Sequence, residues 1–378
     1  MGNRDERPQN LAKWRESRKF ALKIPMLMDK QDITFTHQLT NMLDGLLQEA
    51  APDRIFLLCD DTTNRLCLPL LNGSLAMKEA RLVIIPAGDV NKGIESVGLV
   101  WKALSEGGAT RRSLLVNLGG GMVTDLGGFA AATFKRGIRF INVPTTLLAQ
   151  VDASVGGKTG INWMGLKNEV GVFRNALHVV IDTHFLATLD TENLRSGYAE
   201  MLKHGLISDN AHWQALMDYS LDRPDLTALL PLIKRSVEVK QEIVLQDPQE
   251  QGLRKALNLG HTLGHALESL FMEAGHPVLH GYAVAWGMVG ELYLSHVRQG
   301  FPQSLMREAV NYILEHYGHC PIDCRQYPRV VELMRHDKKN RDGLLLCTLL
   351  SDIGKIHLDQ PLTPADITES LDFLREGF

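Results

Sequence analysis

The sequence lacks the features that mark membrane, secreted or nucleic-acid-binding proteins. No apolar run approaches the ~20 residues of a bilayer-spanning helix, and the start MGNRDERPQN is too polar for a signal peptide. Positive charge is not in excess, because 40 Lys and Arg stand against 44 Asp and Glu, a net charge of -4. This balance excludes a broad basic field for a nucleic-acid backbone. We expect a soluble, cytoplasmic protein that binds neither membranes nor nucleic acids.

Cysteine is scarce, with 5 residues in a chain of 378. Cys320 and Cys324 flank a proline at a spacing that suits a zinc knuckle poorly. An odd, scattered set is typical of reduced thiols in a cytoplasmic compartment. We therefore expect structural thiols at Cys59, Cys67, Cys320, Cys324 and Cys347.

The remaining composition is that of an ordinary globular chain, with 22% charged and 44% apolar residues. At ~150 residues per domain, two domains are expected. Up to about Thr188, short apolar runs such as RIFLLC and RLVIIPAG alternate with helical patterns, which predicts a parallel sheet with helices on its faces. Helical spacing dominates beyond that point. We predict a loose arm over 1–25, an α/β domain over 26–188 and a helical domain over 189–378.

A glycine-rich turn follows the apolar run SLLVNL and leads into a predicted helix. It contains Gly119, Gly120, Gly121 and Asp125. Glycines let a backbone approach phosphate groups closely, and a helix amino terminus favours negative charge. The motif is GxGxxT instead of the GxGxxG dinucleotide fingerprint, so a tight strand-to-helix turn without a ligand stays open.

A second glycine-rich segment, VPTTLLAQVDASVGGKTGINWMGLKN, gathers hydroxyl, ammonium and amide groups. It offers one anion, Asp152, beside Lys158 and Lys167, whereas a solvated loop more often carries mixed charges. Such groups next to glycine turns suit a phosphorylated, hydroxyl-rich ligand. We interpret the segment as part of a ligand site, which also includes Thr145, Thr146 and Asn168.

Histidines cluster in NLGHTLGHALE and HPVLHGYAVAWG. His261 and His265 are four positions apart, which places two metal-ligand side chains on one face of a helix. His280, with His276 as its rival, is a third candidate, and Glu200 could supply a carboxylate. Two or three imidazoles and a carboxylate with one open position would form a catalytic zinc site. Histidines that only cap or pack helices are the alternative.

Arg254 and Asn258 precede these histidines at the same four-residue spacing. They predict one continuous helix whose face carries Arg254, Asn258, His261 and His265. An arginine there suits a carboxylate or phosphate, because its planar fork donates two hydrogen bonds. By itself, Lys338 in DKKNRDG would be part of a solvated charge run.

Six segments, in order and at matching spacing, together resemble the 3-dehydroquinate synthase family. They are GGGMVTDLGGFAAATFKRGIRFINVPTTLLAQVDASVGGKTGIN, GLKNEVG, SGYAEMLKHG, GLRKALNLGHTLGHALE, LHGYAVAWGM and DKKNRDG. The resemblance extends from about Asp53 to Lys355. It implies a Rossmann-like, NAD-binding α/β domain followed by an all-helical, metal-binding domain. It also implies NAD and zinc as cofactors, cobalt as an alternative ion, and usually a homodimer.

The resemblance implies a role for each matching residue. The metal ligands would be Glu200, His261 and His280, which makes His265 a proton acceptor instead of a ligand. Glu250 would be the other proton acceptor. Arg136 would reach the substrate across the dimer interface. Further contacts to a sugar phosphate are implied for Asp152, Lys158, Asn168, Lys203, Lys240, Arg254, Asn258 and Lys338, with Lys339 as the substitute for Lys338.

The resemblance also implies an NAD site. Family members usually carry Glu where Asp89 stands, and their first nucleotide turn is similar to DTN where this chain has DDTTN. The implied contacts are Asp61, Asp89, Lys92, Gly119, Gly120, Gly121, Asp125, Thr145, Thr146, Lys167, Phe185 and Thr188.

The implied reaction is a step of the shikimate pathway that produces 3-dehydroquinate and phosphate. Its substrate is 3-deoxy-D-arabino-heptulosonate 7-phosphate. The steps are transient oxidation by NAD, phosphate elimination, re-reduction and intramolecular aldol closure, so the enzyme is a carbon–oxygen lyase. Lysines around the phosphate and Arg254 on the carboxylate would supply complementary charge.

Other readings of the same pattern define the alternatives. A related sugar phosphate cyclase could act on sedoheptulose 7-phosphate, glucose 6-phosphate or an aminated substrate. Arg254, Asn258 and His265 stand in the dehydroquinate pattern, which disfavours substrates without a carboxylate but not the aminated one. A metal-dependent alcohol or glycerol dehydrogenase would share the architecture without needing so many cationic residues. A non-enzymatic descendant has no support, because no catalytic group is missing.

Overall fold

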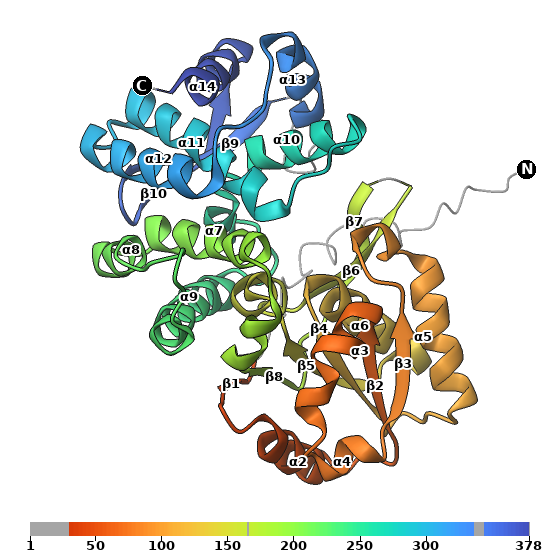
Figure 1. The fold of residues 1–378 in the computed structure, drawn as a ribbon. Coiled ribbons are helices and arrows are strands. Elements are labelled where there is room, and N and C mark those ends of the chain that lie inside the picture. The colour runs from red at the N-terminus through yellow and green to blue at the C-terminus, as the bar shows by residue number, and fades with distance from the viewer. Residues whose placement is uncertain (1–29, 165, 336–343, 378) are drawn as a thin grey trace, which may run out of the picture.

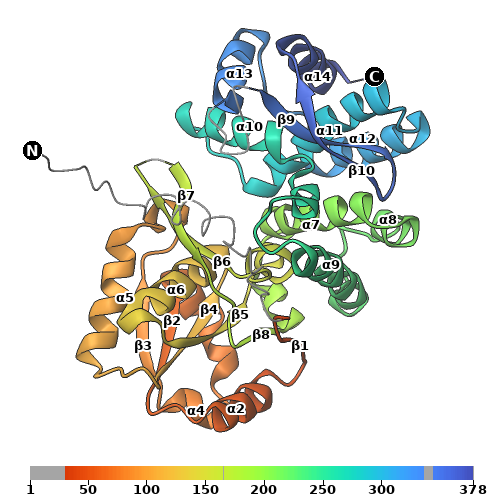
Figure 2. The same ribbon diagram turned by 180° about the vertical axis from the view of Figure 1, so that it is seen from behind.

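The computed structural model describes residues 30–164, 166–335 and 344–377. The predicted arm over 1–25 lies outside these ranges, as do Lys338 and Lys339. Figures 1 and 2 show a sheet domain formed by the first half of the chain and a largely helical part formed by the second half. This arrangement confirms the predicted order of an α/β domain followed by a helical one.

Six parallel strands form the central sheet, in the order β1-β8-β5-β4-β2-β3. Every residue of β4 is buried, with Leu114, Val116 and Leu118 in one apolar core and Leu115 in the other. Both faces of the sheet are therefore covered, as is usual for parallel strands. The strands are β1 (Ile33–Phe35), β2 (Ile55–Asp60), β3 (Arg81–Ile85), β4 (Leu114–Gly119), β5 (Arg139–Pro144) and β8 (His178–Ile181).

Helices cover the two faces as the alternating pattern predicted. Leu43 and Leu47 of α2 pack in the core on one face, and Val97, Val100 and Leu104 of α5 pack in the core on the other. The helices of this domain are α2 (Leu39–Ala50), α3 (Asp61–Leu66), α4 (Leu75–Lys78), α5 (Ile94–Glu106) and α6 (Gly121–Thr133). The apolar runs RIFLLC, RLVII and SLLVNL form β2, β3 and β4.

The second part of the chain contains α7 (Thr191–Ile207), α8 (Asn210–Met217), α9 (Leu226–Gln246), α10 (His261–Glu273), α11 (His280–Gln299), α12 (Gln303–Tyr317), α13 (Tyr327–Arg335) and α14 (Pro364–Glu376). The expectation that it is entirely helical is wrong in one respect. An antiparallel hairpin joins β9 (Leu345–Asp352) to β10 (Lys355–Leu362). Since LLCTLL is a short apolar run, its pattern does not distinguish a buried strand from a buried helix.

A second hairpin lies where the sequence suggested only a glycine-rich segment. It pairs β6 (Lys158–Trp163) with β7 (Leu166–Phe173) and lies beside the helical part in both views (Figures 1 and 2). Gly160 and Gly171 face each other across it, and a Cβ on Gly160 would lie 2.8 Å from the Val170 oxygen. The close pairing of these glycines explains part of the unusual composition of the segment.

The predicted continuous helix through Arg254, Asn258, His261 and His265 is also wrong. A short helix over Leu253–Asn258 ends before α10 begins at His261. Gly260, between the two helices, has a left-handed backbone conformation with φ +77. A Cβ at this position would lie 2.5 Å from Cγ of Met288. The tight approach of α11 therefore requires a glycine and a turn between the two helices.

Within the described ranges, no helix has both the length and the apolar character needed to cross a bilayer.

Candidate active site

The predicted nucleotide residues lie at the carboxyl ends of the parallel strands. The sheet order reverses beside β2, because β3 lies on one side of it and β4 on the other. Ligands of open parallel sheets bind outside the strands at such a reversal. Gly119, Gly120 and Gly121 connect β4 to α6 at this place, and a Cβ on Gly120 would lie 3.0 Å from Cγ2 of Thr146. The turn is therefore tight and opens on a helix amino terminus.

Lys92 links the nucleotide end of the site to the β6–β7 hairpin. Its ammonium donates to Oδ2 of Asp125 at 2.7 Å and to Oδ1 of Asn168 at 2.6 Å. Burial raises the pKa of Asp125, although the Lys92 cation opposes that shift. Lys167 makes a second link, 3.4 Å from Oδ2 of Asp89. The structure therefore brings together residues predicted for the cofactor and residues predicted for the substrate.

The other predicted nucleotide residues differ in how accessible they are. Phe185 is buried in the apolar core beneath the sheet. Thr188 donates from its hydroxyl to the Phe185 carbonyl at 2.7 Å, and Thr145 is buried after β5. Asp61 is exposed at the start of α3, whereas the preceding Asp60 caps that helix by accepting from the Thr63 amide at 2.7 Å.

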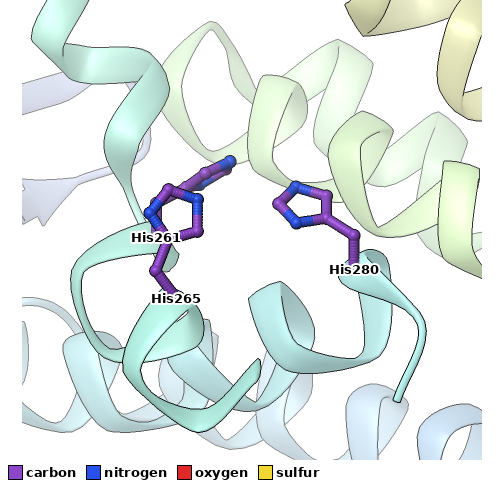
Figure 3. A group of neighbouring side chains, drawn as sticks. All are labelled: His261, His265 and His280. Atoms are coloured by element: carbon purple, nitrogen blue, oxygen red, sulfur yellow. The ribbon is translucent and has the colours of Figure 1, made fainter. Parts of the chain in front are cut away.

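Three helices bring the predicted metal ligands together. Oε1 of Glu200 lies 3.2 Å from Nε2 of His261 and 3.3 Å from Nε2 of His280. Figure 3 shows the rings of His261, His265 and His280 facing a common space. Donor atoms of these three histidines lie within 4.8 Å of one another. The predicted alternative His276 is exposed in the coil after α10.

The charges around this cluster favour a cation. Burial opposes ionisation of Glu200, but the Lys203 ammonium and the His261 ring outweigh it and hold the pKa of that carboxyl well below its usual range. Burial lowers the pKa of His261 to about 3, so its ring is neutral at pH 7. Burial also acts to lower the pKa of His280, but the carboxylates beside it, chiefly Glu268, outweigh burial and raise that pKa to about 10. The cluster thus contains an ionised carboxylate and a neutral imidazole, and it stabilises positive charge beside them.

Lysines and carboxylates alternate next to the metal cluster. Lys203 forms a buried ion pair with Glu200, one turn away on α7. Asp152 lies in a π-helical turn over Ala149–Ala153, with Lys240 at 2.7 Å and Lys203 at 3.9 Å from its Oδ1. Lys240 outweighs the burial of Asp152, and the pKa of that carboxyl is lowered. These groups come from three elements of the chain.

Arg254 and Glu250 border the same region. Arg254 is only 1% exposed and donates to the carbonyls of Pro248 and Gly156 at 2.7 and 3.1 Å. Glu250 accepts from Nδ2 of Asn258 at 2.8 Å and forms an ion pair with Lys158. The cation of Lys158 is half-exposed, with 52% of its side chain accessible. It can therefore exchange a carboxylate partner for an incoming anion.

Arg136 does not join this site within one chain. It lies in a short helix, Phe134–Arg136, between α6 and β5, next to the amino-terminal end of that strand. It borders a hollow with Arg111, Arg112 and Lys135.

Two residues of the site, Glu268 and His204, are not among the residues that the sequence patterns predict. Glu268 lies seven positions after His261 on α10, so helical spacing could have placed it on the same face. His204 follows Lys203 and is fully buried, with a ring nitrogen within 4.8 Å of carboxylate oxygens of Asp152 and Glu200. No local pattern marks His204, because its neighbours come from distant segments.

Comparison with known protein families shows which family the chain belongs to. Residues 82–196 match the family described as 3-dehydroquinate synthase N-terminal, and residues 197–340 match 3-dehydroquinate synthase C-terminal. The chain belongs to the 3-dehydroquinate synthase family. It is 51% identical over 351 residues to the 3-dehydroquinate synthase of Parabacteroides distasonis, covering 93% of this chain and 99% of that relative. For the enzyme of Bordetella pertussis, identity is 41% over 300 residues, with 78% and 82% covered.

The predicted family, the 3-dehydroquinate synthase activity in the shikimate pathway and the carbon–oxygen lyase class are thereby confirmed. Comparison with solved structures shows which proteins share the fold. The structure of 2-epi-5-epi-valiolone synthase from Streptomyces hygroscopicus, with NAD+ and Zn2+ bound, is 27% identical, covers 91% of this chain and 96% of that chain, and has a TM-score of 0.80. The NADH-dependent butanol dehydrogenase A of Thermotoga maritima shares the fold at 14% identity and a TM-score of 0.64, with 92% and 98% covered. The fold therefore accommodates both cyclases and dehydrogenases, and substrate arguments rest on the site.

Proposed function

We propose that the confirmed activity, conversion of 3-deoxy-D-arabino-heptulosonate 7-phosphate to 3-dehydroquinate and phosphate, uses NAD and zinc or cobalt as cofactors. The reaction proceeds by transient oxidation of a substrate hydroxyl, loss of phosphate, re-reduction and intramolecular aldol closure. The observation that supports it best is the convergence of Glu200, His261 and His280 beside a buried array of cationic side chains.

The donor set fits a divalent metal ion. For bonds of ~2.0 Å, the ligands of a tetrahedral ion are about 3.3 Å apart. The separations of 3.2 and 3.3 Å between Glu200 Oε1 and the two imidazole nitrogens match that value. An ion held there would supply Lewis acidity toward a substrate hydroxyl. Glu200, His261 and His280 would hold it, while His265, on the same helix as His261, would accept a proton from the substrate.

The carboxyl edge of the sheet fits NAD. The tight turn over Gly119–Gly121 brings backbone amides and the amino terminus of α6 to the place where a pyrophosphate would bind. NAD bound there would accept a hydride and return it. Asp89 and Lys92 would lie near a ribose, because a carboxylate accepts hydrogen bonds from its hydroxyls. The remaining proposed contacts are Asp61, Asp125, Thr145, Thr146, Lys167, Phe185 and Thr188.

The cations would bind the two anionic ends of the substrate. Arg254 would bind the carboxylate, because a buried guanidinium donates in a fixed planar fork. Lys158 would exchange its ion pair with Glu250 for the phosphate, which leaves Glu250 able to accept a proton. Further proposed contacts to the substrate are Asp152, Asn168, Lys203, Lys240, Asn258 and Lys338.

The proposal also assigns a role to each domain and an oligomeric state to the protein. Residues 26–188 would bind the nucleotide, and residues 189–378 would bind the metal and most of the substrate. Two chains would form a homodimer in which Arg136 reaches the substrate held by the partner subunit. We propose that the enzyme acts in the cytoplasm.

Phosphate release tests the proposal. The zinc-loaded protein with NAD is given 3-deoxy-D-arabino-heptulosonate 7-phosphate, its aminated analogue and sedoheptulose 7-phosphate separately, and products are identified by NMR. Phosphate and dehydroquinate from the first substrate alone are expected. Preference for the aminated analogue would assign the same chemistry to another pathway. Turnover of sedoheptulose 7-phosphate alone would overturn the role of Arg254.

A further inference from the structure

Glu268 is a buried carboxylate at the junction between the metal cluster and the nucleotide edge. It lies on α10, and 6% of its side chain is exposed. Its Oε1 accepts from Nζ of Lys167 at 2.6 Å, and its Oε2 lies 3.3 Å from Nδ1 of His280. Each oxygen thus faces a different partner.

One of these partners is a proposed metal ligand. Nδ1 of His280 faces Glu268, while Nε2 of the same ring faces Glu200. An imidazole that donates from Nδ1 to a carboxylate keeps its lone pair on Nε2, in the orientation that a metal ion needs. With an ion on Nε2, Glu268 would therefore fix both the tautomer and the rotation of the ring.

The other partner belongs to the nucleotide edge. Lys167, on β7, lies between Glu268 at 2.6 Å and Asp89 at 3.4 Å, and Asp89 accepts from Asn162 of the same hairpin at 3.2 Å. A displacement of the hairpin would change the partner of one Glu268 oxygen, and the other oxygen holds His280. A single carboxylate thus connects the hairpin to the metal cluster.

We propose that Glu268 is a positioning residue that orients His280 for metal binding and couples the metal site to the nucleotide site through Lys167. This inference rests on the proposed function, because it assumes that Glu200, His261 and His280 hold the ion. Glu268 itself is outside that ligand set. Its effect on the reaction is exerted through His280 and Lys167.

Metal affinity is the decisive measurement. Zinc dissociation constants are determined by chelator competition for the wild-type protein, Glu268→Gln and Glu268→Ala, each with and without NAD. Loss of an orienting carboxylate behind a ligating histidine typically weakens metal binding by about 10–100-fold. We expect at least a tenfold loss for Glu268→Ala, a smaller one for Glu268→Gln, and altered absorption bands of the cobalt-loaded variants. NAD should tighten zinc binding in the wild type but not in Lys167→Met.

Control variants separate this role from a purely structural one. Glu273→Gln makes the same change on the same helix, but Glu273 is a surface residue paired with Arg329 at 2.7 Å. It should bind zinc like the wild type. His261→Ala tests the ligand set itself. Wild-type zinc binding that survives His261→Ala would overturn the proposed metal site. Binding lost in His261→Ala but within about threefold of wild type in Glu268→Ala would overturn the role of Glu268 alone.

Discussion

Lys240 donates two hydrogen bonds to Asp152, although the residues are 88 positions apart. Its ammonium donates to the main-chain oxygen and to Oδ1 of Asp152, each at 2.7 Å. Asp152 belongs to the π-helical turn after β5, and Lys240 belongs to α9. The pair therefore fastens the helical part to the sheet domain at the edge of the candidate site.

Removal of this cation should destabilise the fold. In Lys240→Met the partly buried Asp152, 28% exposed, loses its nearest cation, and breaking a largely buried pair from one side costs up to roughly 3–5 kcal/mol. Urea unfolding measures the change. The matched control is Lys255→Met, whose partner Asp359 is half-exposed, and about 1 kcal/mol or less is expected there. Equal losses for the two variants would contradict the structural weight of the Asp152 pair.

Loss of one histidine should empty the metal site. His261→Ala removes a nitrogen that lies 3.2 Å from Glu200 Oε1, and elemental analysis of the purified variant should find little zinc. His276→Ala serves as the control, because this exposed residue lies outside the cluster. Full zinc occupancy in His261→Ala would contradict the ligand assignment.

A change at Arg254 should act mainly on the substrate carboxylate. Arg254→Ala should raise KM and lower kcat/KM by about 10²-fold or more, since a charged hydrogen-bonding group is lost in a buried site. Lysine should rescue little, because it lacks the planar fork. Steady-state kinetics with the carboxylated substrate check both variants. Arg329→Ala, which removes a surface ion pair with Glu273, is the control. Unchanged kinetics in Arg254→Ala would refute the role in binding the carboxylate.

The buried His212 should make stability depend on acidity. Its ring lies 3.0 Å from the Ser236 hydroxyl, and burial lowers its pKa from 6.5 to about 4. As pH falls through 6.5 the unfolded chain binds a proton before the folded chain does, so stability present above pH 6.5 is lost down to about pH 4. The free energy of unfolding falls by roughly 3 kcal/mol over this interval. Denaturation curves of the wild type and His212→Gln should converge over this interval, and parallel pH profiles would contradict the prediction.

Two helical glycines should respond oppositely to alanine. A Cβ on Gly264 of α10 would lie 2.9 Å from the Ala283 oxygen, whereas one on Gly98 of α5 meets nothing within 4 Å. Gly98→Ala should therefore stabilise by up to about 1 kcal/mol through helix propensity. Gly264→Ala should destabilise by roughly 1–3 kcal/mol through overpacking. Thermal unfolding decides, and a higher Tm for Gly264→Ala would show that α10 and α11 have room to separate.

Sequence patterns alone predicted the class of the fold, which the structure confirms, and they proposed most members of the candidate site. Alternating apolar runs and helical patterns predicted β2, β3, β4 and their covering helices, because hydrophobic periodicity is a local property. The GHTLGH spacing placed His261 and His265 on one helix face for the same reason. Glu200 and His280 were candidates from their residue types, and the resemblance of six ordered segments implies that both are metal ligands.

Features that depend on distant neighbours are visible only once the chain is folded. Glu268 is recognisable only because Lys167 and His280 approach it from other elements. The break between Asn258 and His261 follows from the packing of α11 against Gly260, which no local pattern reveals. The β9–β10 hairpin includes a short apolar run whose pattern fits either a strand or a helix. Its pairing with the second strand, and not its local pattern, specifies the strand. Local propensity thus specified the elements, and long-range packing specified the partners of each charged group.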